Sequence, residues 1–231
     1  MQKIDIKKLQ IKSEEKTLLD ISFNISKSTA LIGQSGSGKS LTLKALLNLL
    51  PSSLSVNKDI NSNFKMDFKN IGFIPQNPFT SLSPMTKIGK QFFCEEKKKK
   101  EVLKHVSLDT WVLNKYPSEL SGGQIQRVII AIALSKNIKF LLLDEPTTAL
   151  DIENRNNIIK LIDQLVNELN ILILFVTHDI ESIREICEDI VIIKDGNIVE
   201  KGKTLDVLQN PQDIYTKTLI NSTFKNKDFR K

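Results

Sequence analysis

Apolar and polar residues alternate in the first part of the chain, over residues 3–12 and again over residues 21–25. This period of two is typical of a strand with one buried face, and two such strands in succession suggest antiparallel pairing. We therefore expect the N-terminal region to form an antiparallel β sub-domain.

Continuous short apolar runs replace this alternation further along the chain. Such runs have the length of strands and are typical of strands buried on both faces, as in a parallel sheet. A turn signal, Asp195-Gly196, follows the last run and predicts a hairpin. The predicted strands are Thr29–Ile32, Asn70–Ile74, Phe140–Leu143, Ile171–Val176 and Ile190–Ile193.

Helical stretches separate these runs, and the alternation of strand and helix predicts an α/β fold with a mainly parallel sheet. The long helical stretch 87–135 interrupts this order, so we expect it to form an inserted α-helical sub-domain. We treat 1–231 as one domain with a core of 1–86 and 136–231. The predicted helices are Lys39–Leu50, 87–118 with breaks near Ser107 and Pro117, Ser121–Leu134, Ile152–Leu169 and 179–187.

Composition narrows the class of protein. The 231 residues are 40% hydrophobic and 26% charged, which is enough to bury a large core. No apolar run approaches the roughly 20 residues that span a bilayer. Cys94 and Cys187 fit no metal or disulfide spacing, so we expect a reducing cytosol. The net charge of +6 is spread over scattered lysines, and we expect no nucleic-acid partner.

The most specific motif lies between the first short apolar strand and the first helix. It fits the pattern G-x-x-x-x-G-K-[ST], in which backbone N–H groups surround phosphates at the start of a helix. We expect Lys39 to pair with phosphate oxygens and the Ser40 hydroxyl to bind Mg²⁺. The predicted nucleotide-binding residues are Gly33, Gln34, Ser35, Gly36, Ser37, Gly38, Lys39, Ser40 and Leu41.

Polar residues follow three further strands at their carboxyl ends, where open α/β sheets bind ligands. Asp144 and Gln76 are candidates for contact with Mg²⁺, and Glu145 is the candidate general base for an attacking water. His178 is placed to reach a γ-phosphate. The alternatives are that Asp144 and Glu145 cap the next helix, and that His178 and Gln76 are structural.

A second glycine-bearing helix start lies at Ser121-Gly122-Gly123-Gln124. Ser121 and Gln124 have the spacing of a capping box, and a cap alone is the structural alternative. A cap does not need two adjacent glycines, whose bare amides make a second anion site. We therefore expect this helix start to contact the nucleotide of another subunit.

Together these residues resemble the ATP-binding cassette (ABC) family, with its P-loop NTPase core, over nearly the whole chain. Gly33–Ser40 resembles its Walker A motif, Phe140–Glu145 its Walker B motif and Leu120–Gln124 its signature; Gln76, Ala149-Leu150-Asp151 and His178 resemble the Q-loop, D-loop and switch histidine. The resemblance implies catalytic roles for Glu145, His178 and Lys39, dimer communication through Asp151, and a head-to-tail dimer, homo- or heteromeric, that sandwiches ATP. The family's adenine-stacking aromatic residue has no counterpart in Ile11–Lys16.

A finer resemblance is to the peptide and nickel importers of this family. Residues 74–84, 115–117, 145–151 and 215–216 are similar to that subfamily. The resemblance implies a peripheral ATPase at the cytoplasmic face of the inner membrane, with permease subunits and, indirectly, an extracytoplasmic solute-binding protein. Met85 and Ile88 either face the permease or belong to the core. Peptide importers often carry a C-terminal cysteine cluster that this sequence lacks, which favours nickel over a peptide. A small metal chelate is a further alternative, and a soluble ABC ATPase acting on nucleic acid is the remote one.

Overall fold

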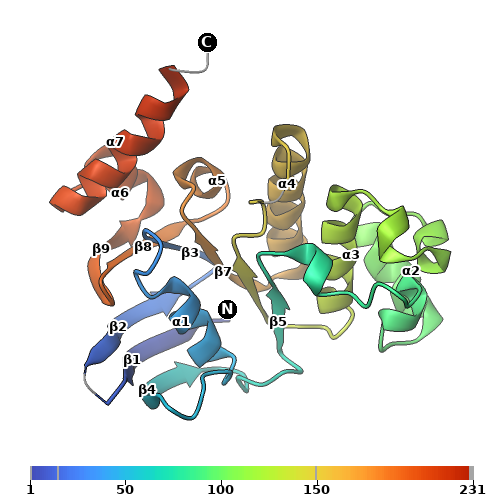
Figure 1. The fold of residues 1–231 in the computed structure, drawn as a ribbon, viewed down its shortest axis with the longest axis horizontal. Helices are drawn as coiled ribbons and strands as arrows, with labels where there is room; N and C mark the ends of the chain where they lie inside the picture. The colour runs from blue at the N-terminus through green and yellow to red at the C-terminus, as the bar shows by residue number, and fades with distance from the viewer. Residues whose placement is uncertain (1, 15, 149, 229–231) are drawn as a thin grey trace. The chain divides into compact units, whose positions relative to one another are not determined.

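In the computed structural model the chain divides into two compact units, Met1–Met66 with Leu172–Lys231, and Asp67–Ile171. The structure describes residues 2–14, 16–148 and 150–228 (Figure 1). The predicted helical stretch 87–135 falls inside the second unit, and the exact bounds of a sub-domain there stay a prediction.

The first unit is built on a mixed sheet with the strand order β4-β1-β2-β9-β8-β3-β7. β1 pairs antiparallel with both β2 and β4, which confirms the predicted antiparallel region at the N-terminus. β3 lies in parallel between β7 and β8, and the β8–β9 hairpin is antiparallel. The strands are β1 (Ile4–Lys12), β2 (Thr17–Ile25), β3 (Ser28–Ile32), β4 (Ser55–Ser62), β7 (Leu172–Thr177), β8 (Asp189–Lys194) and β9 (Asn197–Lys203).

Burial follows the hydrophobic pattern. All five residues of β3 and all six of β7 are buried, as expected for strands with neighbours on both sides, whereas β2 alternates between buried and exposed positions. The edge strand β4 is almost entirely exposed and polar. The helices of this unit are α1 (Lys39–Leu46), α5 (Ile180–Arg184), α6 (Thr204–Gln209) and α7 (Ile214–Asp228).

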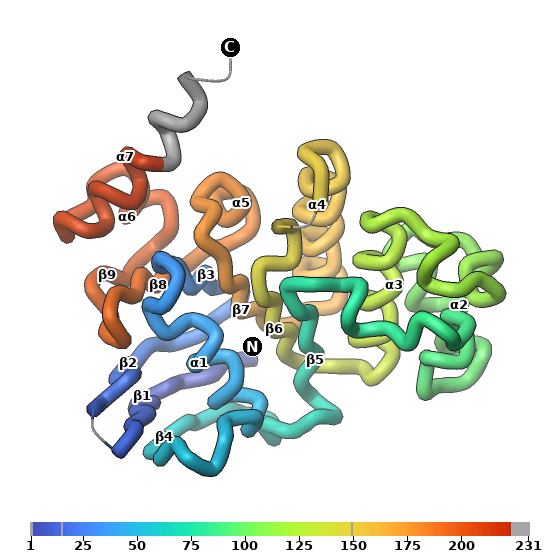
Figure 2. Tube along the Cα trace, viewed as in Figure 1, coloured from blue at the N-terminus to red at the C-terminus, as the bar shows by residue number. Residues whose placement is uncertain are grey.

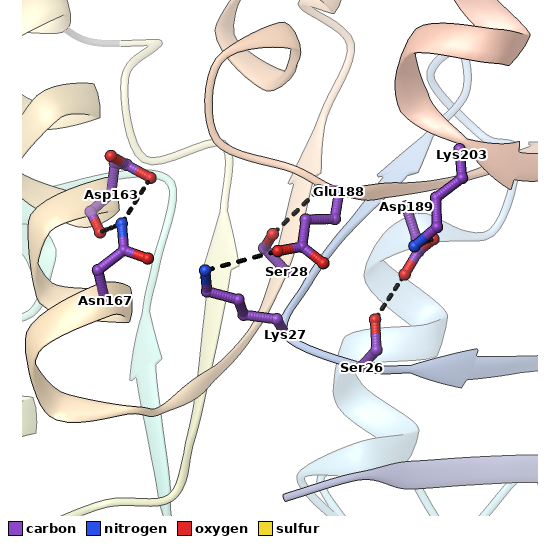
Figure 3. A network of polar contacts seen from close by, with 8 residues as sticks. All are labelled: Ser26, Lys27, Ser28, Asp163, Asn167, Glu188, Asp189 and Lys203. Atoms are coloured by element: carbon purple, nitrogen blue, oxygen red, sulfur yellow. Dashed lines mark hydrogen bonds and ion pairs between the residues drawn. The ribbon is translucent and has the colours of Figure 1, made fainter. Parts of the chain in front are cut away.

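A polar network ties the beginning of β3 to the beginning of β8 (Figure 3). The Ser28 hydroxyl accepts a hydrogen bond of 3.0 Å from the Glu188 N–H, and Lys27 pairs with the Glu188 carboxylate at 3.5 Å. Asp189 accepts from the Ser26 hydroxyl at 2.5 Å and pairs with Lys203 at 2.7 Å. These contacts fix the amino ends of both strands, which leaves their carboxyl ends to carry the phosphate-binding loop and the β8–β9 turn.

The second unit contains the parallel pair β5 (Ile71–Ile74) and β6 (Phe140–Asp144), in which Ile74 lies opposite Leu143. Its helix α3 (Gly122–Leu134) contacts α2 (Glu96–His105), α4 (Ile152–Leu169) and β5. Figure 2 follows the trace through the short 3₁₀ turns that join these elements, which are η1 (Pro78–Thr80), η2 (Ile88–Gln91), η3 (Thr110–Asn114) and η4 (Pro117–Glu119).

Three predicted helices are shorter than expected. The first ends at Leu46 and not at Leu50, because Asn48 takes a left-handed backbone with φ 58°, a conformation that asparagine tolerates. The stretch 87–118 has one α-helix, α2, after which Ser107 is left-handed with φ 53°. The helix predicted for 179–187 is the short α5. The α/β fold class with a mixed sheet is nevertheless as predicted.

Candidate nucleotide site

The phosphate-binding loop connects β3 to α1 in the first unit, where the sequence predicted it. Gly36 and Gly38 adopt φ values of 82° and 110°, which side chains other than glycine rarely adopt. Gly38 is the N-cap of α1, and no side chain caps the helix there. The helix therefore starts with bare backbone N–H groups, as an anion site requires.

The loop is held against the turn between β8 and β9. A Cβ atom on Gly33 would lie 2.4 Å from the Ile193 carbonyl oxygen, so only glycine fits there. The Ser37 carbonyl accepts a hydrogen bond of 3.0 Å from the Gly196 N–H, and the Gly196 carbonyl accepts from the Asp20 N–H at 2.8 Å. The β8–β9 turn is thus the platform on which the loop is shaped.

Lys39 lies inside this loop and is only 8% exposed. Its ammonium group donates to the carbonyl oxygens of Gly33 at 2.6 Å and Gln34 at 2.9 Å. A buried cation surrounded by backbone groups needs strong partners, and phosphate oxygens are stronger ones than carbonyls. The hydroxyl of Ser37 is buried and has no hydrogen-bond partner within the described part of the chain, so it too is ready for a ligand.

Glu145 and Gln76, each predicted to follow the carboxyl end of a strand, are in direct contact in the second unit. The Glu145 carboxylate accepts from the Gln76 side-chain amide at 3.1 Å and from the Thr148 hydroxyl at 3.1 Å. They lie close together because β5 and β6 pair in parallel, and each residue comes just after the carboxyl end of one of these strands. Glu145 has a left-handed backbone with φ 45°, an uncommon conformation that often marks a functional site. Asp144 is the half-buried last residue of β6.

The glycine-bearing start of α3 forms the predicted capping box. The Ser121 hydroxyl accepts from the Gln124 N–H at 3.3 Å, and the Gln124 side chain accepts from the Ser121 N–H at 2.9 Å. Gly123 is explained by packing, because a Cβ there would lie 2.6 Å from Asn154 Oδ1. At Gly122 the nearest atoms would be 3.6 Å and 3.8 Å away, an ordinary contact. Packing within the second unit therefore does not require a glycine at 122.

Asp151 caps α4 through hydrogen bonds with Asn154, the residue that lies beside Gly123. Its carboxylate accepts from the Asn154 N–H at 2.9 Å and from the Asn154 side-chain amide at 2.7 Å. These two hydrogen bonds, the backbone one first, lower the pKa of Asp151 below its usual value. Asn154 thereby connects Asp151 to Gly123. Ala149, the first residue of the predicted D-loop, lies outside the described residues.

His178 is exposed and directly follows β7 in the first unit. Its neighbours fix the backbone on both sides, since Thr177 accepts from the Asp179 N–H at 3.0 Å and Asp179 caps α5. Of the two residues considered for a permease contact, Met85 is 86% exposed and Ile88 is fully buried. Ile88 is therefore a core residue.

Sequence reasoning missed two residues that contact the site. The spacing of Thr148, three residues after Glu145, was a usable signal for a contact across one turn. The hydroxyl of Tyr215 accepts a hydrogen bond of 2.9 Å from the Gln34 N–H in the phosphate-binding loop. Because 181 residues separate these two positions, no local pattern reveals that contact.

Neither a membrane-spanning helix nor a cluster of metal ligands is found among the described residues. In the portion that the structure describes, no helix is both long and apolar enough to cross a membrane. Within the same residues, no group of three or more His, Cys, Asp or Glu side chains is arranged to hold a metal ion.

Comparison with known proteins gives consistent matches. Residues 18–148 match the family described as ABC transporter. The oligopeptide transport ATP-binding protein OppD of Bacillus subtilis is 34% identical over 90% of this chain and 67% of its own length. The nickel import system ATP-binding protein NikD of Staphylococcus aureus is 36% identical over 95% of both chains.

A solved structure agrees with these relatives. CbiO1 of Clostridium perfringens, described as part of the ABC transporter complex CbiONQ, superposes with a TM-score of 0.78 and 26% identity over 90% of both chains. The fold, the order of the motifs and the family match thus agree, and the chain belongs to the ABC transporter family as one of its ATP-binding ATPases.

Proposed function

We propose that this chain is the ATP-hydrolysing, energy-coupling subunit of an ABC importer. The observation that carries the proposal is the buried Lys39 ammonium inside a glycine loop at the start of α1. A cation enclosed by backbone groups at a helix N-terminus suits the phosphate groups of a nucleotide. The importer role is supported by relatives whose names refer to nickel import and metal-staphylopine import, alongside one named for oligopeptide transport.

In this function, the residues of the site have distinct roles. Loop N–H groups of 33–41 and Lys39 bind the phosphates. Glu145 orients and deprotonates the attacking water, held in place by its two donors, Gln76 and Thr148. His178 contacts the γ-phosphate.

The donor set also fits Mg²⁺. The hydroxyl of Ser40, the amide oxygen of Gln76 and the carboxylate of Asp144 are the hard oxygen ligands that this ion prefers, and the rest of its shell comes from nucleotide and water. Bound Mg²⁺ would neutralise charge on the β- and γ-phosphates.

A second ABC subunit, identical or not, completes the site in our proposal. Ser121, Gly122, Gly123 and Gln124 would contact the nucleotide bound by the partner, and Asp151 would communicate between the two sites. Gly122 supports the contact with the partner's nucleotide, because contacts within its own unit leave room for a side chain there. A glycine at that position would allow a phosphate to approach the backbone closely.

The proposed assembly also includes permease subunits in the membrane and, indirectly, an extracytoplasmic solute-binding protein. The chain would lie at the cytoplasmic face of the inner membrane as a peripheral subunit. Exposed apolar residues in the second unit, Met85 at 86% and Phe79 at 54%, support contact with the permease.

For the cargo we propose nickel, with peptides and metal chelates as the alternatives. The support is the match to the nickel import protein over 95% of both chains. Uptake of ⁶³Ni and of labelled dipeptides, in cells with and without the gene, distinguishes these cargoes. Loss of nickel uptake alone is the expected result, and loss of peptide uptake alone would overturn the assignment.

ATP hydrolysis is tested separately in the assembled complex. Lys39→Ala and Glu145→Gln should each abolish turnover, with ATP binding lost in the first variant and kept in the second. Turnover by Glu145→Gln at the wild-type rate would remove Glu145 from the mechanism.

A further inference from the structure

The C-terminal helix α7 makes a direct contact with the phosphate-binding loop. The Tyr215 hydroxyl, on the first turn of α7, accepts a hydrogen bond of 2.9 Å from the Gln34 N–H. The carbonyl of Gly33 belongs to the same peptide group as this N–H. That carbonyl accepts from the Lys39 ammonium at 2.6 Å. One peptide group of the loop is therefore held at both ends, by Tyr215 at its N–H and by Lys39 at its carbonyl.

Tyr215 is itself firmly placed. Asp213 accepts hydrogen bonds from the Tyr215 N–H at 2.7 Å and from the Thr216 N–H at 3.3 Å, which caps the start of α7. The Glu200 carboxylate on β9 in turn accepts from the N–H groups of Gln212 at 2.9 Å and Asp213 at 3.1 Å. The fully buried Thr216 anchors the same turn. The hydroxyl is thus presented to the loop by a folded support and not by a mobile tail.

A cation reinforces this arrangement. The Lys194 ammonium lies 5.2 Å from the centroid of the Tyr215 ring, at the end of β8 just before the turn on which the loop rests. A cation at this distance from the ring is attracted by its π-electrons. Tyr215 is therefore bound by the loop on one side and by the β8–β9 platform on another.

We propose that Tyr215 is a positioning residue for nucleotide binding, which holds the Gly33–Gln34 peptide in the orientation that keeps the phosphate-binding loop open around Lys39. When a triphosphate binds, Lys39 exchanges the Gly33 carbonyl for phosphate oxygens, and the Tyr215 bond then remains to hold this peptide. Without the hydroxyl the peptide rotates more freely and the loop must be ordered by the ligand, which weakens binding. The inference rests on the proposed binding of ATP by this loop.

The test is Tyr215→Phe in the full chain, which removes one oxygen atom and keeps the ring beside Lys194. The chain offers a matched control, Tyr116→Phe, because Tyr116 lies in the second unit beside Lys87. We measure the Kd for ATP, hydrogen–deuterium exchange over residues 33–38, and thermal unfolding.

Loss of a single hydrogen bond predicts that the Kd of Tyr215→Phe rises about threefold to tenfold. Exchange at the Gln34 amide should accelerate, the KM for ATP should rise with kcat nearly unchanged, and Tyr116→Phe should match the wild type. Lys194→Met should show a smaller change in the same direction.

If the wild type binds ATP, unchanged affinity and unchanged Gln34 exchange in Tyr215→Phe would overturn the role proposed for Tyr215 but leave the proposed function standing. A wild type that binds no ATP would overturn the proposed function as well. A general loss of thermal stability, with exchange rising throughout the first unit, would also contradict a positioning role.

Discussion

Glu145 gains its orientation from two short contacts within its own unit. The Gln76 amide and the Thr148 hydroxyl both donate to the Glu145 carboxylate at 3.1 Å. A general base must point at the water that it deprotonates. Donors that hold one carboxylate oxygen also fix the direction in which the second oxygen points. We therefore expect changes at Gln76 and Thr148 to affect the rate of ATP hydrolysis more than the affinity for ATP.

Thr148→Val tests this role, since it replaces the hydroxyl with a methyl group. We expect kcat to fall about threefold to tenfold because one hydrogen bond to Glu145 is lost, with the KM for ATP unchanged. Steady-state ATPase kinetics in the assembled complex give both constants. Thr218→Val on α7 is the control, as its hydroxyl only donates to the Ile214 carbonyl. A change confined to KM would argue against this role for Thr148.

Two glycines of the phosphate-binding loop differ in what they require. A Cβ on Gly33 would collide with the Ile193 carbonyl, whereas Gly36 has open space but a φ of 82°. Gly33→Ala should lower the free energy of unfolding by about 1–3 kcal/mol because the backbone of β8 must move. Gly36→Ala should cost only about 1 kcal/mol, the strain of a left-handed residue. Urea denaturation measures both, and equal losses would contradict the steric account of Gly33.

For single residues, the sequence predicted those site positions that are defined by a fixed spacing of residues within a motif. The glycine loop, Glu145 and the Ser121–Gln124 box follow from local patterns, and the structure places them on the predicted elements. Tyr215 was not predictable as a contact of Gln34, because it depends on how α7 returns to the sheet. Pairing of β5 with β6 likewise had to be seen before Gln76 could be placed beside Glu145.

The start of α3 and the start of α4 form one connected structure through Asn154. Its side chain donates to Asp151 and lies where a Cβ on Gly123 would be. An alanine at 123 would require the tip of the Asn154 side chain to shift, so we expect a change in one helix start to affect the other. The signature and the D-loop are thus linked by a physical contact.

Alanine substitutions at the adjacent residues Gly122 and Gly123 test the contact between Asn154 and the start of α3. Gly123→Ala should lower the free energy of unfolding by about 1–2 kcal/mol, because Asn154 loses its place. Gly122→Ala should leave the stability unchanged but reduce ATP hydrolysis in the complex, because a partner's phosphate needs the space. Denaturant melts and ATPase assays on both variants check this. Equal stability losses, or full activity in Gly122→Ala, would contradict the assignment.

The anchor of α7 should depend on pH through Glu200. Burial raises the pKa of this carboxyl, but hydrogen bonds from the Gln212 and Asp213 N–H groups oppose it, and the net shift is downward. A lowered pKa in the folded state means stabilisation that is present above the ordinary glutamate pKa and is lost as the pH falls through the folded value. Protease cleavage in α7 should therefore increase only in acid, and Glu200→Gln should flatten that dependence. Cleavage that instead rises toward neutral pH would contradict this sign.

Element boundaries were less predictable than the elements themselves. β4 was missed because Ser55–Ser62 is polar and almost fully exposed, and it is a strand only because it pairs with β1. The stretch 87–118 breaks near Ser107 and Pro117, as predicted, but within it only Glu96–His105 is α-helical, and 3₁₀ turns take up much of the rest. Pairing with a distant strand decides a case such as β4, and such pairing leaves no periodic signal in the sequence.

At the scale of the whole molecule, the proposed reaction draws on residues from both units. The first unit carries the glycine loop and His178, and the second carries Glu145, Gln76 and the capped start of α3. In the proposed mechanism, hydrolysis uses both sets of residues. It also uses the partner subunit, because the α3 start is proposed to serve the nucleotide of the other copy.

Assembly in the presence of ATP tests this central claim most directly. We expect Glu145→Gln to bind ATP without hydrolysing it, so size-exclusion chromatography with its partner subunit and saturating Mg-ATP should show a dimer. The same variant with Ser121→Arg added should stay monomeric, because the added side chain blocks the second phosphate contact. A Glu145→Gln protein that elutes only as a monomer under these conditions would contradict the composite site.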